Sequence, residues 1–246
     1  MKASAVIPAY NEAERIGRVL EAASASALVG EVIVVDDGSR DDTAKVAAGY
    51  AGVTLVGLPK NQGKAAAMAA GVRKAQSAVV VFLDADLVGL TKEHVDELVG
   101  PVLRAEVDMA VGQFKGGRGW ITLWQRLVPA ISGQRAMRAS DFAAVPDVER
   151  KGFGVELAIS RAAVRRGLST RLVYLPGVTH VMKEEKRGVV RGLRDRAVMY
   201  AQIVSCAVGN GYDHRRATEE RDRGLGLGRG WIERGATRMV APRCRF

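Results

Sequence analysis

The sequence is poor in cysteine and aromatic residues and has no long apolar run. Its two cysteines, Cys206 and Cys244, give neither a disulfide framework nor the spacing of a zinc site, so we expect free thiols in a reducing compartment. No stretch approaches the ~20 apolar residues of a transmembrane helix, and the start of the chain lacks the basic and apolar segments of a secretory signal. These absences predict a cytoplasmic protein that does not span a membrane.

Two glycine-rich nucleotide-binding motifs are also missing. The chain contains no G-x-x-x-x-G-K-[ST] loop, and no G-x-G-x-x-G follows the first apolar segment, so neither P-loop nor dinucleotide chemistry is supported. A nucleotidyltransferase usually has a loop rich in glycine and arginine after its first strand, and the segment Pro8–Glu12 contains neither residue. These three classes of nucleotide enzyme are therefore disfavoured.

The composition is that of one folded domain with an excess of positive charge. The 246 residues are 48% hydrophobic and 26% charged, which suits a soluble chain with one substantial core. Thirty-seven Lys and Arg against 27 Asp and Glu give a net charge of +10, which favours anionic partners such as nucleic acid, acidic lipid or phosphorylated substrates. A nucleic-acid-binding protein is one alternative. The charge is scattered and no recognised motif accompanies it, so we expect no nucleic-acid partner.

Strand-like and helix-like segments alternate through the first hundred residues. This pattern predicts an α/β fold, in which a mostly parallel sheet is flanked by helices. Strands are expected over residues 4–7, 32–35, 53–58, 79–83, 107–111 and 172–175, and helices over residues 12–25, 43–50, 64–75 and 92–103. We expect Pro8 to end the first strand, Asn11 to cap the first helix, and Gly100-Pro101 to break the last one.

The second half of the chain has two features that bear on partners. Apolar residues between Trp120 and Ile131 fall on one face of an expected helix, which is most often a core face and less often a face for lipid or a second subunit. From Asp213 onward the chain is rich in arginine and glycine, which predicts a basic, poorly ordered tail over residues 213–246. We therefore expect a single domain over residues 1–212, with halves at 1–90 and 91–212, followed by this tail.

The strongest local feature is Asp84-Ala85-Asp86, directly after the apolar segment 79–83. Two carboxylates this close repel each other, and a divalent cation relieves the repulsion. Hard oxygen ligands favour Mg²⁺ or Mn²⁺, and Mg²⁺ usually takes one or two carboxylates together with substrate phosphates. An acidic turn that caps the next segment is the alternative. The position favours the cation, because open α/β sheets bind ligands at the carboxyl ends of their strands.

Four motifs in sequence order resemble those of the family 2 glycosyltransferases of the GT-A fold. They are Val6–Glu12, Val34–Ser39, Asn61–Lys64 and Asp84–Asp86. The resemblance covers residues 1 to about 90 and implies that this half holds a nucleotide-sugar donor. By that resemblance the donor-binding residues are Pro8, Ala9, Tyr10, Glu12, Asp36, Asp37, Lys64, Asp84, Ala85 and Asp86.

Two later segments, Gly152–Glu156 and Gly177–His180, resemble those of glucosyl-3-phosphoglycerate synthases and related small bacterial enzymes. The resemblance implies that His180 joins Asp84 and Asp86 as a metal ligand. Glu156 is expected to orient the acceptor hydroxyl or act as a base, with an ordinary helix-start carboxylate as the alternative reading and Asp141 as the other candidate base. The segment Ser132–Ala136 occupies the acceptor region, which makes Gly133, Gln134 and Arg135 the expected acceptor-binding residues. This segment differs from that of the phosphoglycerate enzymes, so the acceptor stays open.

Together these features predict a metal-dependent glycosyltransferase with a UDP- or GDP-linked sugar donor, Mg²⁺ or Mn²⁺ as cofactor, and Asp86 and Glu156 as catalytic residues. The acceptor is expected to be a small phosphorylated acid such as 3-phosphoglycerate. The basic charge and the apolar face near Trp120 also allow a polyprenyl phosphate or glycolipid at the inner face of the membrane, and the same face allows a homodimer. The sequence leaves open whether the transfer inverts or retains the anomeric configuration.

Overall fold

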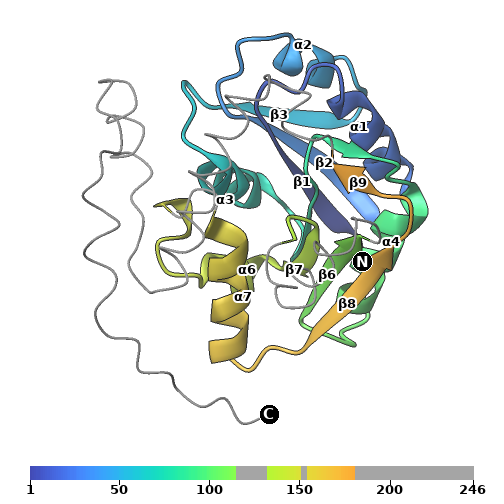
Figure 1. The fold of residues 1–246 in the computed structure, drawn as a ribbon, viewed down its shortest axis with the longest axis vertical. Helices are drawn as coiled ribbons and strands as arrows, with labels where there is room; N and C mark the ends of the chain where they lie inside the picture. The colour runs from blue at the N-terminus through green and yellow to red at the C-terminus, as the bar shows by residue number, and fades with distance from the viewer. Residues whose placement is uncertain (115–131, 151–153, 181–246) are drawn as a thin grey trace, which may run out of the picture.

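The structure, a computed structural model, describes residues 1–114, 132–150 and 154–180. Three features expected from the sequence lie outside the described residues: the apolar face between Trp120 and Ile131, the segments Gly152 and Phe153 before Glu156, and the tail over 213–246. The described residues form one α/β unit (Figure 1).

The centre of the fold is a seven-stranded sheet with the strand order β3-β2-β1-β4-β7-β6-β8. Its strands are β1 (Ala3–Ala9), β2 (Val29–Asp36), β3 (Val53–Gly57), β4 (Val79–Phe82), β6 (Met109–Phe114), β7 (Arg135–Arg138) and β8 (Thr170–Leu175). All neighbours are parallel except β7, which is antiparallel to both β4 and β6. A separate two-stranded ribbon pairs β5 (Leu87–Val88) with β9 (Thr179–His180). The mostly parallel sheet predicted from the sequence is confirmed.

Helices cover both faces of this sheet. They are α1 (Ile16–Ala25), α2 (Thr43–Ala48), α3 (Lys64–Lys74), α4 (Lys92–Leu103), α6 (Ala139–Ala143) and α7 (Val155–Arg165), with a short 3₁₀ turn, η2 (Val148–Arg150). The alternation of side chains along β1 explains the two layers, because Ala5 and Ile7 pack with α1 and α4, whereas Val6 packs with α3 and α7. The core is thus two apolar layers that sandwich the sheet.

Helix α3 lies especially close to the sheet. Its buried face consists largely of alanine, and Gly71 sits over β1, where an added Cβ would lie 2.3 Å from Cγ1 of Val6. Small residues allow this close approach. The approach fixes the position of Lys64, the first residue of the helix.

The first strand runs further than the sequence predicts. It continues through Pro8 to Ala9, although Pro8 was expected to end it. The carbonyl of Val6 accepts a hydrogen bond from the β4 side and the carbonyl of Ala9 accepts one from the β2 side, so Pro8 faces the β4 side. Pairing with β4 stops at Val6, and Pro8 therefore costs the sheet no hydrogen bond.

Two expectations about helix ends are wrong. Asn11 does not cap α1, which begins at Ile16. The backbone of Asn11 has φ 57°, and the Oδ1 of Asn11 accepts a hydrogen bond from the backbone amide of Arg40. Helix α4 does not break at Gly100-Pro101 but runs on to Leu103. Pro101 lies in the last turn, so the helix lacks only one amide hydrogen bond there.

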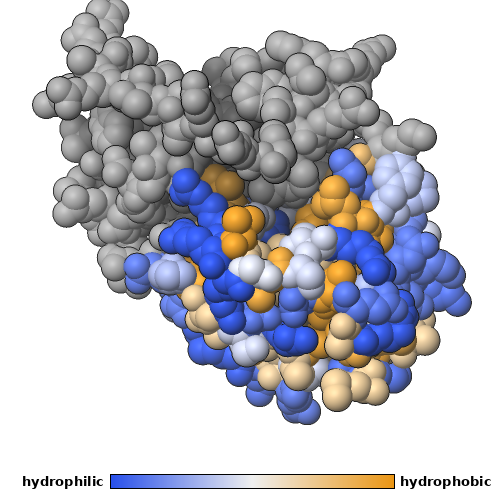
Figure 2. All heavy atoms as spheres, turned by 90° about the horizontal axis from the view of Figure 1, so that it is seen from below, coloured by the Kyte–Doolittle hydropathy of each residue, from blue (hydrophilic) through white to orange (hydrophobic). Residues whose placement is uncertain are grey.

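Strand β8 is an edge strand of the described sheet and exposes Leu172 and Tyr174. From below, the described surface shows hydrophobic residues interspersed among hydrophilic ones (Figure 2). Among the described residues, no helix combines the length and apolar character needed to cross a membrane.

Candidate active site

The predicted donor residues gather at one edge of the sheet. Strands β1, β2 and β4 are parallel neighbours, so Tyr10, Asp36 and Asp84 lie at or just past their carboxyl ends, at the same edge of the sheet. The chain moves outward from β1 to β2 and β3, and then returns to β4 on the other side of β1. This change of direction is the switch point at which open α/β sheets bind ligands.

Three consecutive backbone amides of the loop after β1 donate hydrogen bonds to side chains of the loop after β2. The amide of Asn11 donates to Ser39 Oγ (3.0 Å), that of Glu12 to Thr43 Oγ1 (2.8 Å), and that of Ala13 to Asp41 Oδ2 (3.2 Å). The loop 9–13 is thereby held against the loop 38–43. Hydrogen bonds therefore hold together the two segments predicted to contact the nucleoside, around residues 8–12 and 36–37.

Asp37 braces the loop that leads into α3. Its carboxylate accepts the amides of Gln62 (2.7 Å) and Gly63 (2.8 Å), and its side chain is buried. Burial raises the pKa of Asp37 to about 6, although the two amide hydrogen bonds favour the charged form. Gly63 has φ 92°, a conformation that suits glycine, and places Lys64 at the start of the helix. Asp37, predicted to bind the donor, thus also positions Lys64.

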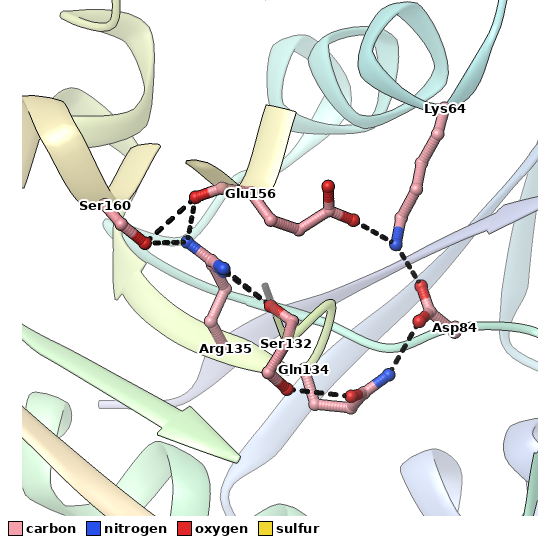
Figure 3. Close-up of polar contacts among 7 residues, drawn as sticks. All are labelled: Lys64, Asp84, Ser132, Gln134, Arg135, Glu156 and Ser160. Atoms are coloured by element: carbon pink, nitrogen blue, oxygen red, sulfur yellow. Dashed lines mark hydrogen bonds and ion pairs between the residues drawn. The ribbon is translucent and has the colours of Figure 1, made fainter. Parts of the chain in front are cut away.

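Lys64 lies between two carboxylates that come from distant parts of the chain. Its Nζ is 2.6 Å from Asp84 Oδ1, after β4, and 2.6 Å from Glu156 Oε1, in the first turn of α7 (Figure 3). Burial alone lowers the pKa of Lys64, but the charges of the two carboxylates outweigh it and raise this pKa above its ordinary value. Lys64 is therefore a cation, and it joins the predicted donor half to the predicted acceptor half.

The loop before β7 reaches the same carboxylate from the other side. Gln134 is fully buried and donates from Nε2 to Asp84 Oδ2 (2.8 Å), and Ser132 Oγ donates to Gln134 Oε1 (3.1 Å). Gly133 lies so close that an added Cβ would be 2.4 Å from Asp84 Oδ2 and 2.6 Å from Lys64 Nζ. Both oxygens of Asp84 thus have protein partners, and any side chain at position 133 would displace the ends of Asp84 and Lys64.

Arg135 completes a ring of contacts. Its guanidinium is fully buried and donates to the backbone carbonyls of Ser132 (3.2 Å from Nε) and Glu156 (3.1 Å from Nη1). The ring runs through Lys64, Asp84, Gln134, Ser132, Arg135 and Glu156 and back to Lys64 (Figure 3). The predictions from sequence include five of its members. They lack Ser132, whose serine hydroxyl gives no motif-level signal.

The third predicted metal ligand is placed by backbone pairing. Residue His180 of β9 lies opposite Leu87 of β5, the residue that directly follows Asp86. The ribbon is tight, because a Cβ on Gly89 would lie 2.4 Å from the carbonyl oxygen of Gly177. The sequence-distant segments 84–88 and 177–180 are therefore neighbours, as a shared metal site requires.

The donor set suits a hard cation that also binds substrate. Asp84 and Asp86 are only partly buried, and Asp84 already forms an ion pair with Lys64. Within residues 1–114, 132–150 and 154–180, no three Asp, Glu, His or Cys side chains form a ready cluster for a metal. Mg²⁺ characteristically takes one or two carboxylates and completes its shell with substrate phosphates and water. The residues present fit that mode of binding.

Comparison with known proteins places this geometry in a family. Residues 4–157 match the family described as "Glycosyl transferase family 2". A dodecaprenyl-phosphate galacturonate synthase of Rhizobium johnstonii is 30% identical over 174 residues, which are 67% of this chain and 49% of that protein. A dolichyl-phosphate beta-glucosyltransferase of Trichomonas vaginalis is 38% identical over 100 residues, which are 35% of this chain and 29% of that protein. The chain spans about half the length, or less, of these curated relatives.

Solved structures agree with this placement. Glucosyl-3-phosphoglycerate synthase from Mycobacterium tuberculosis, in complex with Mn²⁺, UDP and glucosyl-3-phosphoglycerate, aligns with a TM-score of 0.70 and 27% identity, covering 85% of this chain and 80% of that one. The complex of the same enzyme with Mg²⁺ and UDP also gives 0.70, at 26% identity, covering 85% and 79%. The match over residues 4–157, the GT-A fold and the residues at the strand ends lead to one conclusion: the chain belongs to glycosyl transferase family 2.

Proposed function

We propose that this glycosyltransferase moves a sugar from a nucleoside diphosphate sugar, bound at the ends of β1, β2 and β4, to a phosphorylated acceptor bound beside Glu156. The observation that carries the proposal is the ring in Figure 3, in which Lys64 joins a carboxylate of the donor half to one of the acceptor half. A transfer between two substrates needs both halves to meet at one point, and here they meet within hydrogen-bond distance.

Asp84, Asp86 and His180 are the residues proposed to hold Mg²⁺ or Mn²⁺. The cation would supply positive charge where the departing diphosphate gains negative charge. The structures of the Mycobacterium tuberculosis enzyme with Mn²⁺ or Mg²⁺ and UDP support this assignment. Lys64, whose ammonium forms an ion pair with Asp84, is proposed to bind the diphosphate as well. The loops 8–12 and 36–37 are proposed to hold the nucleoside.

In the transfer, the bond from the anomeric carbon to the diphosphate oxygen breaks, and its electron pair stays on the diphosphate. The acceptor oxygen forms the new bond and loses its proton. Glu156 is the proposed recipient of that proton in an inverting reaction, whereas a diphosphate oxygen would take it in a retaining one. Glu156 is buried and held by Lys64, which orients its carboxylate in either case.

The acceptor is proposed to carry a phosphate group. Structures of the Mycobacterium tuberculosis enzyme contain phosphoglyceric acid or glycerol 3-phosphate, and two curated relatives are named for dodecaprenyl phosphate and dolichyl phosphate. The net charge of +10 suits an anionic substrate of either kind. We propose a small phosphorylated acid first and a polyprenyl phosphate as the second candidate. Gly133 and Gln134 are proposed to shape the acceptor side from beneath, since Gln134 is buried.

The test of the donor half is nucleotide release from a panel of UDP- and GDP-sugars with Mg²⁺ or Mn²⁺. We expect one donor to turn over, dependence on the metal, and at least ~100-fold loss in Asp86→Ala, because charge stabilisation at a reacting centre is worth that much or more. Asp42→Ala is the matched control, since Asp42 is exposed and makes no side-chain capping hydrogen bond. Absence of both turnover and metal-dependent nucleotide binding would contradict the proposal.

The acceptor is tested with the donor that this panel identifies. We expect transfer to 3-phosphoglycerate in solution or to a polyprenyl phosphate in vesicles, detected as a new glycosylated product by mass spectrometry. Product with the first acceptor supports the small acid, and product with the second alone supports the lipid. Equal transfer to an acceptor without phosphate would overturn the phosphorylated class.

A further inference from the structure

Arg135 is the most unusual charged residue of the described chain. It lies on β7, is 0% exposed, and is the largest of the fully buried side chains. Burial lowers the pKa of Arg135 to about 10, so the group still carries its charge at neutral pH. A charge is costly to bury unless hydrogen bonds compensate for the lost water. The location of those hydrogen bonds therefore indicates its role.

The guanidinium connects two segments that lie apart in the sequence. On one side Nε and Nη2 both donate to the carbonyl of Ser132, at the start of the loop that carries Gly133 and Gln134. On the other side Nη1 donates to the carbonyl of Glu156 (3.1 Å) and to Ser160 Oγ (3.4 Å). Ser160 Oγ itself donates to the same Glu156 carbonyl (2.9 Å). The first turn of α7 is thus tied to the loop before β7 through one side chain.

We propose that Arg135 is a positioning residue that sets Glu156, rather than a direct ligand of the acceptor. This inference rests on the proposed function of Glu156 and replaces the direct acceptor contact expected for Arg135 from the sequence. The planar guanidinium fixes the directions of its hydrogen bonds to Ser132 and Glu156, whereas the donors of a lysine ammonium all start from one nitrogen and have no such fixed fork. Arg135 thereby fixes the distance between the Glu156 carboxylate and the pair formed by Lys64 and Asp84.

Loss of this link is expected to show in turnover and hardly in donor binding. In Arg135→Met, a substitution of similar length that removes the buried charge, kcat should fall roughly tenfold or more, because small displacements of reacting groups are costly. The KM for the donor should stay within about twofold, since the donor loops are built by other residues. Arg135→Lys should resemble Arg135→Met. Arg138→Met, on the exposed end of the same strand, is the matched control and should leave turnover unchanged.

A double-mutant cycle separates positioning from general damage. If Arg135 acts through Glu156, Arg135→Met should cost little further turnover in the background of Glu156→Gln. Independent, multiplicative losses would overturn the proposal. Ser160→Ala, a milder change on the same link, should lower kcat in the same direction by a few fold, and it serves where Arg135→Met does not fold.

A second readout does not depend on activity. The Lys64 ammonium, bound to Asp84 and Glu156, should give a ¹H–¹⁵N correlation by NMR that is absent in Lys64→Met. We expect Arg135→Met and, to a lesser extent, Ser160→Ala to shift this signal toward its position in Glu156→Gln. An unchanged signal in Arg135→Met would overturn the positioning role. If the wild type turns over no donor at all, the proposed function fails, while the NMR result still decides on Arg135.

Discussion

At the scale of single residues, Asp37 shows how a buried carboxylate serves the loop beside it. The Asp37 carboxylate accepts hydrogen bonds from two backbone amides before α3, but burial raises the pKa of Asp37 to about 6, above its ordinary value of 3.8. The folded protein therefore binds this proton more tightly than the unfolded chain does. Between pH about 4 and 6, ionisation of Asp37 should lower the free energy of unfolding as the pH rises.

The reference for this effect is Asp37→Asn, which does not titrate at position 37. Relative to this variant, the wild type should gain stability on the order of 2 kcal/mol when the pH falls from 7 to 4. Urea unfolding followed by circular dichroism at several pH values measures the difference. A constant relative stability would show that the two amide hydrogen bonds cancel the effect of burial, and one that falls on acidification would show that they outweigh it.

Gly133 is the residue with the least space in the site. A methyl group there would meet Asp84 Oδ2 and Lys64 Nζ, both within 3 Å. The ends of these side chains can move, so Gly133→Ala should cost less than about 1.5 kcal/mol of stability while it separates the ion pair. We expect metal-dependent turnover to fall about tenfold or more. Gly57→Ala, where an added Cβ meets nothing within 4 Å, should retain turnover; equal activity of both variants would sink the prediction.

At the scale of elements, helix α3 determines where Lys64 lies. Its close packing depends on Gly71, where an added Cβ would lie 2.3 Å from Val6 Cγ1 and 3.2 Å from Val35 Cγ2. These neighbours belong to the core and cannot move away easily. Gly71→Ala should therefore destabilise the fold by about 1–3 kcal/mol, even though alanine favours helix, and the midpoint of urea unfolding measures this. A more stable variant would mean that helix propensity outweighs the contact.

The elements also show which parts of the site the sequence could reveal. Lys64 follows a glycine turn, and Asp84–Asp86 follow the apolar strand β4, which pairs in parallel with β1. The sequence pattern and the motifs were therefore sufficient to predict that these residues lie at one edge of the sheet. Strand β7 was not predicted, because four residues with arginine at both ends carry no strand pattern. Without β7, the burial of Arg135 and its link to α7 could not be foreseen. Such contacts depend on tertiary packing between distant segments.

At the scale of the whole molecule, the site draws on both halves of the described sheet. Its residues come from the ends of β1, β2 and β4, the loop before β7 and the starts of α3 and α7. A ligand that binds there contacts residues of the ring, and the ring joins elements that pack in different parts of the core. Binding should consequently stabilise the described unit as a whole rather than one half of it.

This expectation can be measured by thermal unfolding of the full chain with UDP or GDP, with and without Mn²⁺. A nucleotide at about 100 times its Kd stabilises the folded state by ~2.7 kcal/mol, which corresponds to a rise in Tm of roughly 5–10 °C for a domain of this size. We expect one transition that moves as a unit, and Asp84→Asn should lose the part of the shift that depends on Mn²⁺. Asp42→Ala should behave as the wild type. Two transitions of which only one moves would mean that the halves 1–90 and 91–212 unfold separately, and that the ring around Lys64 does not couple them.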